Sequence, residues 1–115
     1  MSTFPSLESQ TEILPLELKA LMDAGTEVIV LDIREPLEVA ICRLPDSLHI
    51  PMRHLPDRLA ELEKFRESDI VVYCHAGIRS AACVAYMRDR GFKALNLRGG
   101  IDAWSHDVDK TVPRY

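Results

Sequence analysis

One stretch decides both the fold and the chemistry of this chain: Ile70-Val71-Val72-Tyr73-Cys74-His75-Ala76-Gly77-Ile78-Arg79-Ser80. It begins with an apolar run typical of a buried strand and leads into a helical pattern over residues 81–90. Cys74 therefore lies at the end of a strand, in a short loop that contains Gly77 and Arg79. Backbone N–H groups converge in such a loop, and the following helix adds the positive end of its dipole. These are the surroundings of a reactive thiolate rather than of a cysteine that only fills the core.

Short apolar runs alternate with helical patterns along the rest of the chain. Strands are predicted at residues 11–13, 28–31, 47–50, 70–73 and 94–97. Helices are predicted from residue 15 up to Gly25, at 36–41, 55–65 and 81–90, and around Ile101 and Trp104. In the first helix, Leu16, Leu18, Leu21 and Met22 are expected to share one broad face, and in the third Leu59 and Leu62 are expected to point inward. The alternation and the apolar strands predict an α/β fold with an open parallel sheet and helices on both faces.

Sites in open parallel sheets lie beyond the carboxyl ends of the strands. Three segments rich in reactive or charged side chains follow predicted strands: residues 32–35, 74–80 and 98–100. We expect these segments to meet at one edge of the sheet.

Composition limits the classes of function. The chain has 115 residues, 47% hydrophobic and 28% charged, which suits one domain over residues 1–115. A net charge of −4 without a cluster of Lys and Arg argues against nucleic acid or a membrane surface as partner. No apolar run approaches a membrane span, and residues 1–5 lack the features of a signal peptide, so we expect a cytoplasmic protein.

The three cysteines, Cys42, Cys74 and Cys83, are odd in number and form no C-x-x-C pair. A disulfide scaffold is therefore not expected, and a reducing compartment is the simpler interpretation. Cys83 lies in a helix of small residues and is expected in the core. Cys42 either fills space or forms a disulfide with Cys74, from which the sheet should separate it. The histidines show no metal-ligand spacing with the cysteines, so neither a metal nor a cofactor is expected.

Three motifs in this order resemble the single-domain form of the rhodanese family of sulfurtransferases. They are Leu31-Asp32-Ile33-Arg34-Glu35-Pro36, Cys74-x-x-Gly77-x-Arg79-Ser80 and Leu97-Arg98-Gly99-Gly100-Ile101-Asp102-Ala103-Trp104. The resemblance covers roughly residues 12–105 and departs from many members at residues 42–47, which lead into the third strand. By the predicted topology we expect that segment opposite the cysteine loop, where it affects local packing more than chemistry. The tail, residues 108–115, is similar to the ends of rhodanese domains fused to enzymes that activate sulfur-carrier proteins.

The resemblance implies a five-stranded parallel sheet and a reaction that passes through a cysteine persulfide. Cys74 would take sulfane sulfur from a small anionic donor such as thiosulfate and pass it to a thiophilic acceptor such as a thiol or cyanide. A sulfur-carrier protein or a cysteine desulfurase is the corresponding protein partner. The active-site loop then comprises His75, Ala76, Gly77, Ile78, Arg79 and Ser80, with Asp32, Arg34 and Arg98 in support.

A free thiol is only about 3% thiolate at pH 7, so Cys74 needs a pKa lowered by roughly two units. The loop amides and the next helix are the expected source, and Gly77 suits a turn with positive φ. Arg79 has two open roles: it holds the oxyanion end of the donor, or it buttresses the loop. Arg34 and Arg98 are expected to make the rim basic. Two roles stay open for Asp32, Arg34 and Glu35: ion pairing and hydrogen bonding that stiffen the loop, or direct contact with substrate. His75 tunes Cys74, moves a proton or simply faces solvent.

Two further classes of function stay open. In one, Cys74 relays sulfur between proteins and free thiosulfate is a poor donor. In the other, the scaffold performs phosphatase or arsenate reductase chemistry. Related phosphatases have five residues between Cys and Arg, whereas four intervene here, residues 75–78. The shorter loop should suit a single sulfur atom better than phosphate.

Overall fold

A computed structural model describes residues 10–115. Five strands form a single sheet in the order β1-β5-β4-β2-β3, and all its neighbouring strands are parallel. β4 lies at the centre, so the segment that carries Cys74 leaves the middle of the carboxyl edge. The elements are β1 Glu12–Ile13, α1 Pro15–Asp23, β2 Ile29–Asp32, α2 Pro36–Ile41, β3 Leu48–His49, η2 Met52–His54, α3 Leu55–Arg58, η3 Leu59–Phe65, β4 Asp69–Tyr73, α4 Ile78–Asp89, β5 Lys93–Leu97 and α5 Gly100–Asp107.

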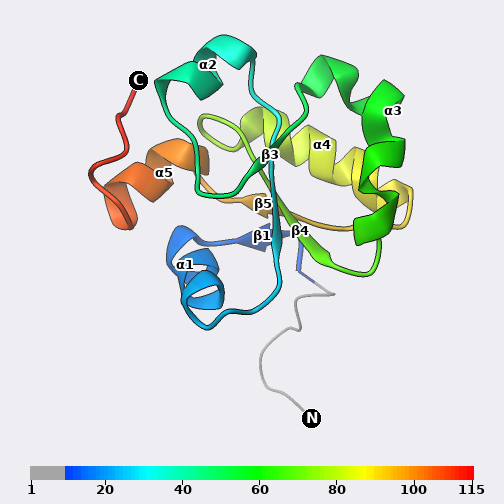
Figure 1. Cartoon of the computed structure of the whole chain (residues 1–115), viewed down its shortest axis with the longest axis horizontal. Coiled ribbons are helices and arrows are strands. Elements are labelled where there is room, and N and C mark those ends of the chain that lie inside the picture. The colour runs from blue at the N-terminus through cyan, green and yellow to red at the C-terminus, as the bar shows by residue number, and fades with distance from the viewer. Residues whose placement is uncertain (1–9) are drawn as a thin grey trace.

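Both faces of the sheet are covered by helices (Figure 1), which confirms the predicted fold class. Alternate residues of β4 enter separate apolar clusters, because successive side chains of a strand point to opposite faces. Val72 packs with residues of α3, η3 and α4, whereas Val71 packs with residues of α1 and α5. The near-continuous apolar sequence of the strand is thus explained by burial on both sides.

Two helical predictions need correction. The helix expected over residues 55–65 is divided into α3 and the 3₁₀ helix η3, with Arg58 at φ −112° and ψ 7° between them. In α1, Leu18 is buried but Leu16 is 63% exposed. Residues two apart are about 200° apart around a helix, so Leu16 and Leu18 cannot both face the sheet.

The segment over residues 42–47 does not lie opposite the cysteine loop, as we expected from the sequence. The third strand, β3, has only two residues, and these pair with the last two residues of β2. The preceding segment therefore reaches the carboxyl half of the sheet. There the amide of Leu44 donates to the hydroxyl group of Tyr73 at 3.1 Å, and the carbonyl of Cys42 accepts from the Arg34 guanidinium at 2.6 Å.

Within residues 10–115, the helices are all too short or too polar to span a bilayer.

Candidate active site

Cys74 follows the central strand β4, and its loop ends where α4 begins at Ile78. Gly77 precedes α4 with φ +96°, a left-handed conformation that side chains rarely adopt. This turn starts α4 earlier than the sequence pattern predicted, and it directs the first amides of the helix back toward Cys74.

Three hydrogen-bond donors point at the sulfur atom of Cys74. The amide of Gly77 lies 3.1 Å from Sγ, the amide of Ser80 lies 3.4 Å away, and the Ser80 hydroxyl lies 3.2 Å away. Cys74 is 1% exposed, so water does little to screen these contacts. Such a group of donors, aimed at one buried sulfur, stabilises negative charge on it.

The loop amides face the sulfur because the loop carbonyls are bonded elsewhere. The carbonyls of Cys74 and His75 accept hydrogen bonds, each at 3.0 Å, from the amides of Ile101 and Asp102 in the first turn of α5. Gly100 makes this approach possible, since a Cβ atom there would lie 2.5 Å and 2.4 Å from the same carbonyl oxygens. The closing motif therefore acts through backbone contact with the loop.

Opposing effects determine the pKa of Cys74. Burial raises the pKa, but the hydroxyl of Ser80 and the amides of Ser80, Gly77 and Ala76 together lower it below its ordinary value. Cys83 behaves in the opposite way: burial, with a smaller contribution from the charge of Cys74, raises its pKa to about 11. Cys83 is 3% exposed and packs in the same apolar cluster as Cys74, as expected for a core residue.

Cys42 lies on the other side of the sheet from Cys74. It packs against the cluster that contains Tyr73 and Trp104, whereas Cys74 belongs to the opposite cluster. All three cysteines are free thiols. The sheet thus separates Cys42 from Cys74, as the topology predicted.

Arg79 forms an ion pair with Glu38 of α2, a residue that sequence reasoning missed. The two terminal nitrogens of Arg79 lie 2.7 Å and 2.9 Å from the carboxylate oxygens of Glu38. Hydrogen bonding to Arg79 is the largest cause that lowers the pKa of Glu38 to about 2. The side chain of Arg79 is 38% exposed, and its charge interacts with Cys74 through space. Arg79 therefore joins α4 to α2 beside the sulfur.

Asp32 and Arg34 form a buried ion pair, which is the structural role left open for them, and Arg34 does not contribute to a basic rim. Both side chains are fully buried. One Asp32 oxygen accepts from the Arg34 amide at 2.9 Å and from Nε at 3.0 Å, and the other accepts from Nη2 at 2.8 Å. The Tyr73 hydroxyl donates to that second oxygen at 2.8 Å. Burial of this kind needs every donor and acceptor satisfied, so the pair stiffens the loop after β2.

Arg98 does not contribute to a basic rim either. It is exposed and lines a hollow of about 190 Å³ beside β1 and α1, together with Glu12 and Glu17. The expected rim of Arg34 and Arg98 is therefore wrong, because one residue is buried and the other lies at the β1 side of the sheet.

His75 packs against Tyr115, whose involvement the sequence did not indicate. The two ring centroids are 4.3 Å apart. The Tyr115 hydroxyl also accepts from Arg34 at 2.8 Å and donates to Glu38 at 2.7 Å. His75 is half-buried rather than facing solvent, while Ala76 and Ile78 are exposed. The tail thus closes a polar network around the loop.

Asn96 of β5 is a further site residue, after Glu38 and Tyr115, that the sequence analysis missed. Its side-chain nitrogen donates to the carbonyl of Gly77 at 3.0 Å, and its oxygen accepts from the Ser80 hydroxyl at 2.5 Å. Asn96 is 7% exposed. A polar residue inside an apolar strand next to the cysteine strand was the signal that could have found it.

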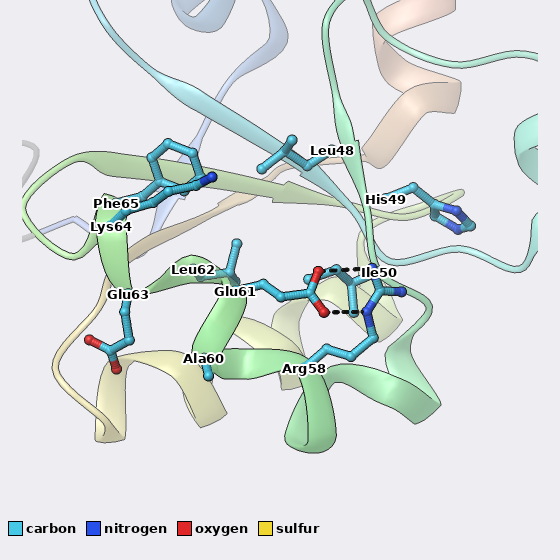
Figure 2. Close-up of a pocket in the computed structure, with 10 residues that line it drawn as sticks. All are labelled: Leu48, His49, Ile50, Arg58, Ala60, Glu61, Leu62, Glu63, Lys64 and Phe65. Atoms are coloured by element: carbon cyan, nitrogen blue, oxygen red, sulfur yellow. Dashed lines mark hydrogen bonds and ion pairs between the residues drawn. The ribbon is translucent and has the colours of Figure 1, made fainter.

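Two hollows lined by residues within 10–115 contain no cysteine. One of about 580 Å³ lies beside β3 and η3, where Arg58 and Glu61 form an exposed ion pair (Figure 2). Another, of about 620 Å³, runs along α4 from Gly77 and Ile78 to Arg88. Among residues 10–115, no cluster of His, Cys, Asp and Glu is suited to hold a metal ion.

We compared this chain with protein families, with curated proteins and with solved structures, and each comparison found rhodanese-like or sulfurtransferase proteins. The family model described as a rhodanese-like domain matches residues 14–107. A protein of Allochromatium vinosum named sulfurtransferase is 45% identical over 78% of this chain and 85% of its own length. The Drosophila virilis protein named adenylyltransferase and sulfurtransferase MOCS3 is 35% identical over 95% of this chain, which spans only 25% of it. The crystal structure of a rhodanese-like domain protein from Staphylococcus aureus superposes with a TM-score of 0.79 at 29% identity, covering 92% of this chain and 99% of that one.

We predict that Gly100→Ala destabilises the protein more than Gly25→Ala. Both glycines have positive φ, which costs roughly 1–2 kcal/mol for alanine. A Cβ at Gly25 meets nothing within 4 Å, whereas one at Gly100 meets the loop carbonyls. Overpacking should add about 1–3 kcal/mol to the loss at Gly100. Urea denaturation of both variants measures the difference, and equal losses would contradict the close approach of α5 to the loop.

Proposed function

The chain belongs to the rhodanese-like family, and we propose that Cys74 carries sulfane sulfur as a persulfide, from thiosulfate to a thiol or cyanide. The observation that carries this proposal is the set of three donors on one buried sulfur. The name of the 45% identical relative supports a sulfurtransferase.

The reaction proceeds in two displacements, each without net oxidation. The Cys74 thiolate attacks the outer sulfur of thiosulfate, the bond between the two donor sulfurs breaks, and sulfite leaves with the bonding electron pair. The acceptor then attacks the terminal sulfur of the persulfide, and the bond to Cys74 breaks to restore the thiolate. Donors to sulfur raise the fraction of Cys74 that is thiolate near neutral pH in the first step, and they stabilise Cys74 as the leaving group in the second.

Entry of the donor requires side chains around the loop to move, since Cys74 is 1% exposed. Arg79 is suited to this, because its side chain is 38% exposed and its partner Glu38 is an anion. An anionic donor can replace Glu38 in the bidentate contact, and this brings the oxyanion beside the sulfur. Arg79 would then both buttress the loop at rest and hold the donor during reaction.

We predict that protein exposed to thiosulfate gains the mass of one sulfur atom on Cys74. Peptide mapping by mass spectrometry locates the added atom. Cys74→Ser should abolish the gain with no loss of folded structure, whereas the control Cys42→Ser should keep it, because Cys42 lies on the other side of the sheet. Sulfur transfer by Cys74→Ser would refute the mechanism.

We also predict opposite effects at the two ends of the Arg79–Glu38 ion pair. Arg79→Ala should raise the KM for thiosulfate, since it removes the cation that receives the donor. Glu38→Gln should lower this KM, because it removes the anion that competes with the donor for Arg79. Steady-state kinetics with thiosulfate test both variants. Similar losses in both would make the pair purely structural.

A second candidate function is a sulfur relay between proteins, in which free thiosulfate is a poor donor. Similarity to MOCS3 extends over 95% of this chain, and in that protein the matching part is fused to further sequence. The surface beside the site also favours a protein partner: Leu37 and Ile78, which flank Glu38 and Arg79, are 83% and 82% exposed. Exposed apolar side chains next to a reactive group suit contact with another protein.

The two candidates make different predictions about the preferred donor. If the protein is a small-molecule enzyme, thiosulfate transfers sulfur to Cys74, cyanide removes it, and the cycle repeats for many turnovers. For the relay, a cysteine desulfurase with cysteine loads Cys74 much faster than thiosulfate does. In the relay, Leu37→Ser should slow loading by the desulfurase and leave loading by thiosulfate unchanged. Equal slowing with both donors would argue against a protein-docking surface there.

A further inference from the structure

Asn96 connects two parts of the active-site loop in a fixed orientation. Its nitrogen donates to the Gly77 carbonyl, and its oxygen accepts from the Ser80 hydroxyl. A carbonyl can only accept a hydrogen bond, so the amide nitrogen must face Gly77. The oxygen of Asn96 is thereby directed at Ser80, and the opposite orientation would place two acceptors against each other.

The Ser80 hydroxyl has two acceptors and a single proton. Its oxygen lies 3.2 Å from the Cys74 sulfur and 2.5 Å from the Asn96 oxygen. A hydroxyl group donates to one of these at a time. While Cys74 is a thiol, its S–H can donate to the Ser80 oxygen and the hydroxyl can donate to Asn96. When Cys74 is a thiolate, the hydroxyl turns to the sulfur, and the buried oxygen of Asn96 loses its donor at a cost.

We propose that Asn96 is a positioning residue that competes with the Cys74 sulfur for the single Ser80 proton. Its competition limits how firmly Ser80 holds a sulfur anion. No covalent bond to hydrogen breaks, since the hydroxyl only rotates between its two acceptors. The effect on the charge of Cys74 is independent of substrate, whereas its kinetic consequence rests on the proposed function.

The competition matters because the charge moves during sulfur transfer. The Cys74 sulfur is anionic before attack and neutral in the persulfide, where the terminal sulfur carries the charge. The oxygen of Asn96 accepts the hydrogen bond of the Ser80 hydroxyl again when the Cys74 sulfur becomes neutral. Without Asn96, the thiolate would be held more tightly and would be a weaker nucleophile.

Several ionisable groups face Cys74, and all are retained in the proposed variants. Arg79 and Cys83 on α4 interact with its charge through space. His75 follows it in the loop, and the charge of His75 acts on Asp102 of α5. A change in the titration of Cys74 between variants therefore reports Ser80 and Asn96.

The test is a titration of the Cys74 thiolate by ultraviolet absorbance, with Cys74→Ser subtracted. Asn96→Ala should lower the titration midpoint by about one unit, because one hydrogen bond becomes fully available to the sulfur. Ser80→Ala should raise the midpoint by a similar amount. In a Ser80→Ala background, Asn96→Ala should have no further effect, since the shared proton is gone. An unchanged or raised midpoint in Asn96→Ala overturns the proposal, and so does a decrease that persists without the Ser80 hydroxyl, which would assign Asn96 to the Gly77 contact.

Asn96→Asp provides a second variant of the same shape in case Asn96→Ala does not fold. A carboxylate would hold the Ser80 proton more strongly, so the midpoint should rise, and rise less in the Ser80→Ala background. An equal rise of the Cys74 midpoint in both backgrounds would mean that the carboxylate acts only by charge repulsion, and it would overturn the proposal.

A kinetic measurement separates this inference from the proposed function. At a pH above both midpoints, loading from thiosulfate should be about threefold slower in Asn96→Ala, as expected for a nucleophile whose pKa falls by one unit. Loading at or above the wild-type rate would contradict the competition. If the wild type itself forms no persulfide, the proposed function fails while the titration still decides the role of Asn96.

Discussion

Two backbone amides reach the sulfur of Cys74 because two carbonyls of the same loop are hydrogen-bonded to α5. The amides of Ile101 and Asp102 donate hydrogen bonds to the carbonyls of Cys74 and His75, each at 3.0 Å. With these oxygens turned away, the amides of the loop and of the first turn of α4 face inward. The site therefore depends on two helix N-termini with different tasks: α5 orients the loop, and α4 holds the sulfur.

A second polar network supports the loop from the β2 side. The buried pair of Asp32 and Arg34 is linked to Tyr73, the residue before Cys74, and to Tyr115. Tyr115 reaches Glu38, which in turn holds Arg79. Residues far apart in sequence thus connect the segments that follow β2 and β4 with the C-terminal tail. Positions of groups near the sulfur are consequently coupled, and a single substitution here should alter several contacts.

The sequence was sufficient to predict the order of elements, the layers and the place of Cys74. Those features follow from apolar periodicity and from glycine and proline positions, which act locally. The division of the helix over residues 55–65 and the exposure of Leu16 were not predicted, since both depend on which face meets the sheet. The position of residues 42–47 was wrong because the length of β3 follows from pairing with β2.

The roles of individual polar residues were harder to predict. Arg34 was expected either in a basic rim or in an ion pair that stiffens the loop, and only the tertiary structure reveals the partners that make its burial tolerable. Glu38 and Tyr115 carry no local signal, because each acts on a residue distant in the chain. Asn96 is marked only as a polar residue in an apolar strand, and its partner Ser80 is not indicated by the sequence. Loop chemistry at Cys74 was predictable, whereas the contacts that tune it arise from packing.

The most direct test of this account is the titration of Cys74 in the folded protein against the same residue in urea. The difference in thiolate absorbance between the wild type and Cys74→Ser isolates this one sulfur in both states. Our account predicts a lower midpoint in the folded protein, since the donors of the loop and of α4 together outweigh burial. A midpoint equal to or above that of the unfolded chain would show that burial prevails and that the loop does not hold a sulfur anion.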